Sequence, residues 1–93
     1  MGIQQIETGM LAKSLAGHDK DTCYVILKAD DLYAWLTDGR LKPIGKPKKK
    51  KRKHIQVVYT IPENLKAKLS GQETLRDEDI KYAIKLYTQS GNE

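Results

Sequence analysis

The sequence predicts a mainly β fold, a small barrel of five short strands, followed by a pair of C-terminal helices. Two observations predict it. Segments with an apolar residue at every second position, separated by turn residues, run through the first 61 residues. The last third of the chain changes to the spacing of an amphipathic helix. With 93 residues, the chain forms one domain with a small core.

The first three strands are short and end at turns. One is expected within "GMLAKSL" (residues 9–15), before a turn around Gly17, and the next two in "CYVILKA" (23–29) and "LYAWL" (32–36). The alternation in the second strand predicts two faces, formed by Val25, Leu27 and Ala29 and by Tyr24, Ile26 and Lys28.

After the third strand, Asp38-Gly39 favours a two-residue hairpin, because both central positions must accept a positive φ. Pro43 and Pro47 follow, and proline removes a donor from the strand ladder. Residues 42–52 are therefore expected to be a loop or an edge strand. The period of two returns from His54 to Ile61 and predicts the fifth strand.

The last third predicts two helices. "PENLKAKLSG" begins at Pro62 and ends at Gly71, and "LRDEDIKYAIKLYTQSG" (75–91) follows. The second carries one apolar stripe, made by Ile80, Ala83, Ile84 and Tyr87. We expect an antiparallel pair on the barrel. The chain then divides into residues 1–61, a barrel with a basic loop at 42–53, and residues 62–93, a helical hairpin.

The positive charge is concentrated in one segment. Residues 40–54 contain nine Lys or Arg and no acidic residue. Because the whole chain has 17 basic and 12 acidic residues, the remainder has 8 basic against 12 acidic ones, although the net charge is +5. One positive patch on a mildly acidic body is the kind of field that captures phosphate.

The tract "PKKKKRK" has several readings. Taken alone it is typical of a solvated, disordered tract, a nuclear-import signal or a polybasic membrane tether. It lies inside a small domain, however, where folding holds the repelling cations together, and a polyphosphate ligand relieves that repulsion. The candidate nucleic-acid-binding residues are Lys20, Arg40, Lys42, Lys46, Lys48, Lys49, Lys50, Lys51, Arg52, Lys53 and His54.

Lysine dominates this set and acts as a point charge, so we expect recognition of the phosphate backbone with little base specificity. Five or six neutralised phosphates would give a log-log salt slope of about −4 to −5. Replacing Lys48–Lys51 with Gln is expected to weaken binding and to leave the melting temperature nearly unchanged.

Aromatic side chains offer a second kind of contact. Tyr33, Trp35 and Tyr59 lie on expected strands and could stack on unpaired bases if they faced outward. The chain has no Phe, however, so Tyr and Trp must supply the aromatic part of the core. We therefore expect Trp35 to be mostly core.

The sequence contains little that indicates catalysis or the binding of a cofactor or metal. Ser14 has no His within suitable reach, and no phosphate-binding glycine loop of the Walker type occurs. Cys23, His18 and His54 match no zinc pattern. No apolar run approaches the length of a membrane helix. The expectation is a protein that is not an enzyme and has no cofactor, metal, membrane or small-molecule partner.

Several pieces together resemble the bacterial KOW-domain RNA-binding proteins, small relatives of the archaeal and eukaryotic large-subunit ribosomal protein "fourteen-e". They are Gly9, the turn from Ser14 to Lys20 around Gly17, Asp38-Gly39-Arg40, and the run from Lys46-Pro47-Lys48-Lys49 to His54. The likeness spans residues 9–56, and "GQETLRDEDIKYAIKLY" is similar to the family's C-terminal helix. The chain departs at Asp21-Thr22, where the family has another glycine, and at His18, where arginine is common.

The resemblance implies an SH3-like barrel that binds structured RNA without catalysis. The expected partner is ribosomal RNA of the large subunit, with possible contacts to ribosomal proteins, and the expected location is the cytoplasm, associated with ribosomes. Two alternatives stay open: an adaptor module that docks an acidic protein, and a small-barrel DNA-binding protein.

Overall fold

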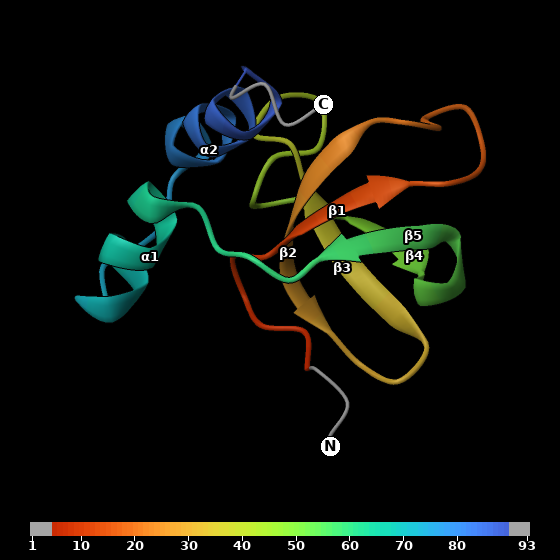
Figure 1. Ribbon diagram of the computed structural model, residues 1–93, viewed down its shortest axis with the longest axis horizontal. Coiled ribbons are helices and arrows are strands. Elements are labelled where there is room, and N and C mark those ends of the chain that lie inside the picture. The colour runs from red at the N-terminus through yellow and green to blue at the C-terminus, as the bar shows by residue number, and fades with distance from the viewer. Residues whose placement is uncertain (1–4, 90–93) are drawn as a thin grey trace.

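The computed structural model describes residues 5–89, which form a mainly β fold with C-terminal helices (Figure 1). The ends of the two predicted parts, residues 1–4 and 90–93, lie outside the described residues. The elements are β1 (Leu11–Ser14), β2 (Cys23–Ala29), β3 (Tyr33–Thr37), β4 (Lys48–Lys51), the 3-10 helix η1 (Arg52–His54), β5 (Ile55–Val58), α1 (Glu63–Ser70) and α2 (Asp77–Gln89).

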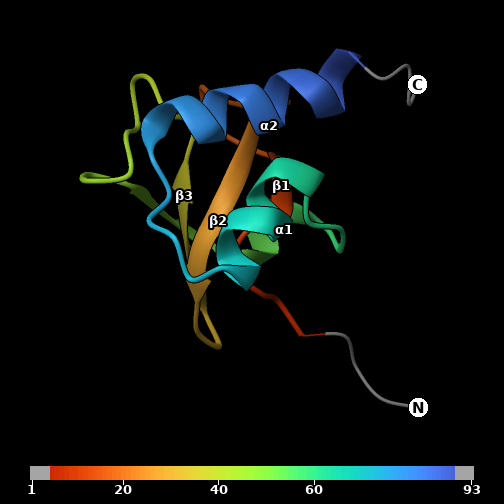
Figure 2. The ribbon, with the colours of Figure 1, turned by 90° about the vertical axis from the view of Figure 1, so that its left-hand side faces the viewer.

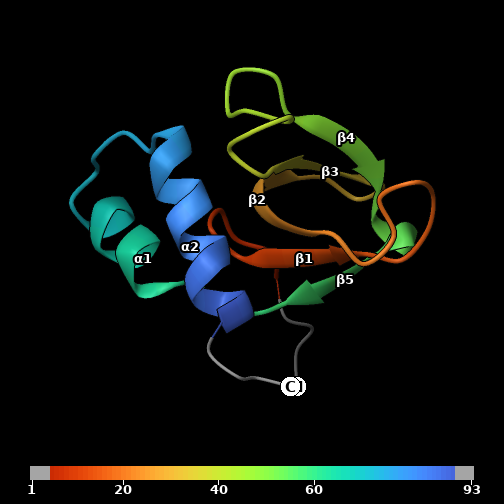
Figure 3. The same ribbon diagram turned by 90° about the horizontal axis from the view of Figure 1, so that it is seen from above.

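The five strands form one antiparallel sheet in the order β4-β3-β2-β1-β5. Its two edges, β4 and β5, are consecutive in the chain and are joined by η1 alone. The sheet is strongly curved, so that β3 and β4 lie across from β1 and β5 (Figure 3). The predicted positions of β1, β2, β3, β5 and both helices are confirmed to within three residues at each end, because each carries a clear apolar period.

Two hydrophobic clusters lie on opposite faces of the sheet. The concave face holds Met10, Ala12, Tyr24, Ile26, Ala34, Leu36 and Ile55. On the other face, Leu11 of β1 and Val25 of β2 pack against Leu65, Ile80 and Ala83 of the helices. Figure 2 shows α1 and α2 lying over this side of the sheet. The apolar stripe predicted for α2 is confirmed, since Ile84 and Tyr87 also pack against this second cluster. No helix within residues 5–89 is long and apolar enough to cross a membrane.

The predicted faces of β2 are wrong beyond Ile26. The register with β3 shifts between Ile26 and Lys28, which is a β-bulge at Leu27. One extra residue moves every later side chain to the opposite face. Ala29 therefore joins the concave face, paired with Ala34, and Lys28 points outward beside Trp35.

The predicted two-residue hairpin at Asp38-Gly39 is also wrong, because residues 38–47 all separate β3 from β4. The Asp38 carboxylate accepts hydrogen bonds from the backbone amides of Arg40 (2.8 Å) and Lys42 (2.9 Å), which forms a local turn. The predicted basic loop 42–53 is shorter than expected. Lys48–Lys51 is an edge strand, the second of the two possibilities, and Arg52–His54 is η1.

Gly39 lies directly against the start of α2. We therefore expect Gly39→Ala to be destabilising. The residue has φ +76°, and an added Cβ would lie 2.5 Å from the backbone oxygen of Asp77. Since both the backbone conformation and the contact oppose a side chain, the loss should exceed about 1 kcal/mol. Chemical denaturation measures it. Gly45→Ala is the control, because nothing lies within 4 Å of a Cβ at Gly45.

Candidate nucleic-acid interface

The four consecutive lysines of β4 point alternately to the two faces of the sheet. Lys48 pairs with Leu36 and Lys50 with Ala34, both residues of the concave cluster, so these two lysines share the inner face. Lys49 and Lys51 are exposed on the outer face. A strand geometry therefore divides the tract into an inner and an outer pair of cations.

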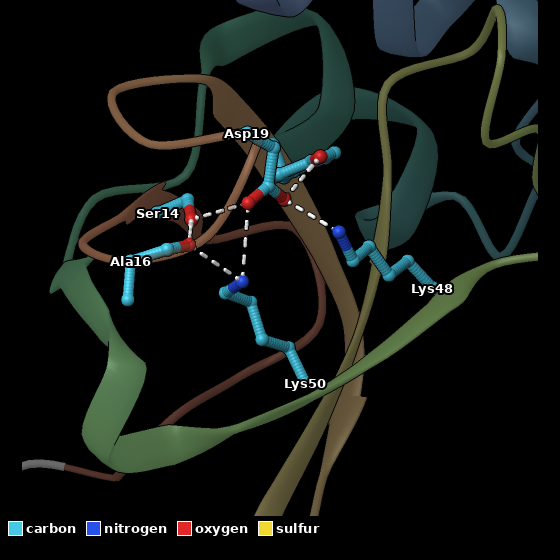
Figure 4. A network of polar contacts seen from close by, with 6 residues as sticks. Ser14, Ala16, Asp19, Lys48 and Lys50 are labelled. Atoms are coloured by element: carbon cyan, nitrogen blue, oxygen red, sulfur yellow. Dashed lines mark hydrogen bonds and ion pairs between the residues drawn. The ribbon is translucent and has the colours of Figure 1, made fainter.

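The inner pair shares a single carboxylate, Asp19, in the turn between β1 and β2 (Figure 4). Lys48 Nζ lies 2.8 Å from Asp19 Oδ2, and Lys50 Nζ lies 3.1 Å from Asp19 Oδ1. The hydroxyls of Ser14 (2.9 Å) and Tyr24 (2.7 Å) also donate to this carboxylate. The side chains of Asp19 and Lys50 are only 13% and 11% exposed, so the cluster is an almost buried ion network.

This environment fixes the charge of Asp19. Burial by itself raises the pKa of a carboxyl, but the hydrogen bonds from Lys48, Tyr24, Ser14 and Lys50 outweigh it. The pKa of Asp19 is therefore held far below its ordinary value. Lys50 also donates to the Ala16 carbonyl at 3.0 Å, so its ammonium has two protein acceptors.

The depressed pKa of Asp19 predicts a loss of stability in acid. A carboxyl whose pKa is lower in the folded state stabilises the fold fully above its unfolded pKa, about 3.9, and loses that contribution as pH falls towards the folded value. We expect the difference in unfolding free energy between wild type and Asp19→Asn to be constant from about pH 5 to 7 and to shrink below about pH 4. Urea titrations of both proteins across this range measure the difference.

The outer pair of lysines lies beside aromatic rings. Strand register places Lys28, Trp35 and Lys49 side by side on β2, β3 and β4, and we call them the Lys28–Trp35–Lys49 row. The Nζ atoms of Lys28 and Lys49 lie 4.6 and 5.5 Å from the centroid of the Trp35 ring. Lys49 Nζ also lies 4.3 Å from that of Tyr33. Exposed cation–π contacts of this kind contribute about 0.5–1 kcal/mol each.

The cations continue past the end of β4. We call Lys49, Lys51, Arg52 and Lys53 the basic edge. Its last three members, with Asp31, Leu32 and Tyr33, line an open groove of about 290 Å³. The guanidinium of Arg52 donates to the Asp30 carbonyl at 2.9 Å, which holds this side chain against the turn between β2 and β3. Leu32 is 68% exposed at the same place.

The other predicted contact residues lie around this edge and beyond it. Lys20 is exposed in the turn that carries Asp19, next to the inner face of β4. Arg40 and Lys46 are exposed and Lys42 is half-buried in the 38–47 connection, and His54 is half-buried at the end of η1. Arg40 lines a groove with Lys81 and Lys85 of α2, so it faces the helices. The predicted set is therefore not one continuous surface.

Three features were missed in the sequence. Lys48 and Lys50 both bind Asp19. The expectation that Lys48–Lys51 could all be replaced with Gln without loss of stability does not fit these contacts. Lys28 reaches the aromatic face only through the bulge. Trp35 is half-buried and belongs to neither cluster, so its assignment to the core is wrong; Tyr24, 2% exposed, is the aromatic residue of the concave core.

No group of three or more His, Cys, Asp or Glu residues within 5–89 is arranged to hold a metal ion. Burial raises the pKa of the Cys23 thiol to about 11, which disfavours the thiolate that binds metals. Comparison of the chain with models of known protein families and with curated proteins found no match.

Proposed function

We propose that this protein is a non-catalytic RNA-binding protein, associated with ribosomes in the cytoplasm, that holds structured RNA such as large-subunit ribosomal RNA through its phosphates. The observation that carries the proposal is the basic edge, where four cations, three of them consecutive, lie beside two outward-facing aromatic rings. Phosphates satisfy such cations, and aromatic rings interleaved with them are typical of RNA-binding surfaces.

The balance of charge supports this. Of the nine cations in residues 40–54, two bind Asp19, which leaves seven. None of the seven forms an ion pair with a carboxylate of residues 5–89. Backbone amides of Tyr33 and Leu32 and the nearby charges of Lys49 and Arg52 lower the pKa of Asp30, so this carboxylate offsets part of their mutual repulsion. A polyanion would relieve the remainder.

We also propose that the curved sheet is an SH3-like barrel, as the resemblance to KOW-domain proteins implies. The connection between the two edges supports it. In a flat sheet, five strands would hold β4 and β5 about 19 Å apart. The four residue-to-residue steps of chain from Lys51 to Ile55 span at most about 14 Å. The sheet must therefore coil until its edges approach each other.

Sedimentation of cell extracts through sucrose gradients tests the function. The protein should migrate with large ribosomal subunits at low salt and be released at high salt, because its contacts are mainly to phosphates. Migration at the top of the gradient at low salt would contradict the ribosomal part of the proposal.

Competition experiments separate the rivals. Structured RNA should displace a labelled RNA more strongly than duplex DNA does at matched salt. The reverse order would favour the DNA-binding alternative. Saturable binding to an acidic protein in nuclease-treated extract, lost on changing the exposed face of α2 rather than the basic edge, would favour the adaptor alternative.

A further inference from the structure

We propose that the outer face of β2, β3 and β4 is a stacking platform for unpaired nucleotides, with one base on Trp35 and a neighbouring base on Tyr33. This inference rests on the proposed function and narrows it: the site would take single-stranded or looped segments of RNA rather than a duplex. The juxtaposition that carries it is the Lys28–Trp35–Lys49 row next to Tyr33.

Side-chain direction shows that the rings are available. Tyr33 and Trp35 alternate along β3 with Ala34 and Leu36, which are fully buried in the concave cluster. The two rings therefore lie on the opposite face, two residues apart on one strand. Helices cover this face only further along, where Val25 packs against Ile80 and Ala83. Neighbouring aromatic side chains on an open sheet face are the usual platform for successive unpaired bases.

The lysines over the rings do not block stacking. Lys28 and Lys49 are exposed, and among the contacts of residues 5–89 neither forms an ion pair with a carboxylate. An exposed cation–π contact is weaker than the stacking of a base on an aromatic ring. A base can therefore replace the ammonium group, which then moves aside to meet the phosphate of the same nucleotide. The two kinds of contact support each other.

The groove beside Tyr33 indicates the path that a bound RNA strand would follow beyond the two rings. It is lined by Lys51, Arg52 and Lys53, and it continues from the Tyr33 ring towards η1. Arg52 is fixed there by its bond to the Asp30 carbonyl, so its charge is already in place. A chain of nucleotides that stacks on Trp35 and Tyr33 would bring its following phosphates onto these cations. A rigid duplex cannot present bases to the rings at the same time.

Fluorescence tests the proposal directly, because Trp35 is the only tryptophan of the chain. We expect an oligouridine of about ten nucleotides to quench and shift the emission of the wild-type protein, and a blunt RNA duplex of equal length to bind without doing so. Quenching by both to the same extent would overturn the platform, since a duplex exposes no base faces along its length.

Variants add a second readout, with affinity measured by the anisotropy of labelled RNA. Trp35→Val should weaken oligouridine binding about tenfold and leave duplex affinity and the salt slope unchanged. Trp35→Phe, which keeps a ring, should retain most of the affinity. Tyr82→Leu is the matched control, because Tyr82 is an exposed tyrosine, 52% accessible, on α2. Thermal melts confirm that each variant is folded.

The outcomes separate the two proposals. If both RNAs bind with a steep salt dependence and Trp35→Val binds oligouridine as tightly as wild type, the platform is wrong while phosphate binding stands. If neither RNA binds even at low salt, both proposals are wrong.

Discussion

Asp19→Asn should destabilise the fold by about 3–5 kcal/mol, which is the usual cost of removing one partner of a buried ion pair. The asparagine would present an amide NH2 or a single oxygen where two carboxylate oxygens now accept four hydrogen bonds. Lys50 would keep its charge with only the Ala16 carbonyl as acceptor. In a domain of this size the melting temperature should fall by more than about 10 °C.

The neighbouring turn residue Asp21 provides the control. Asp21→Asn makes the same chemical change two residues away, where the carboxylate is 69% exposed and lies 3.9 Å from Lys13 Nζ. Its effect should stay within about 0.5 kcal/mol, because exposed ion pairs contribute little. A melting temperature of Asp19→Asn equal to that of Asp21→Asn would show that the contacts of Asp19 with the inner lysines do not stabilise the fold.

The triple variant Lys49→Gln, Lys51→Gln, Lys53→Gln should bind RNA on the order of a hundredfold more weakly at 0.1 M salt, because it loses three exposed cations of the basic edge. The log-log salt slope should become shallower by about 2 to 3. Anisotropy titrations over a range of salt measure both. The melting temperature should change little, since none of the three forms an ion pair with a carboxylate of residues 5–89.

Three exposed lysines of the helices form the matched control. Lys66→Gln, Lys81→Gln, Lys85→Gln removes the same net charge from α1 and α2. If both triple variants lost affinity equally, binding would depend on overall charge alone, and the basic edge would not be the site. An unchanged affinity in the first triple variant would contradict the proposed function directly.

The elements that could be predicted are those with an apolar period. β2 was found with its observed bounds, and the stripe on α2 with its buried residues, because burial on one face of a regular element leaves a repeat in the sequence. β4 carries no such repeat. Four lysines in a row resemble a solvated tract. They become a strand here because β3 pairs with them and Asp19 binds the two that turn inward.

The candidate site was less predictable because it depends on contacts between distant segments. Asp19 precedes Lys48 by 29 residues, so the chain order does not show that the two meet. The bulge at Leu27 has no mark in the sequence, yet it decides that Lys28 lies next to Trp35. Composition could locate the cations, but only the strand register shows which of them face outward.

The lysines of β4 also bear on self-association. An outermost strand leaves half of its backbone groups unpaired, and such strands recruit partners from other molecules and so begin aggregation. A second copy that aligned its own β4 with this one would bring eight ammonium groups together. Four of them, Lys48 and Lys50 of each copy, would share only the two Asp19 carboxylates that they already bind. The same charges that we propose for RNA would thus keep concentrated solutions of this protein from forming fibres along β4.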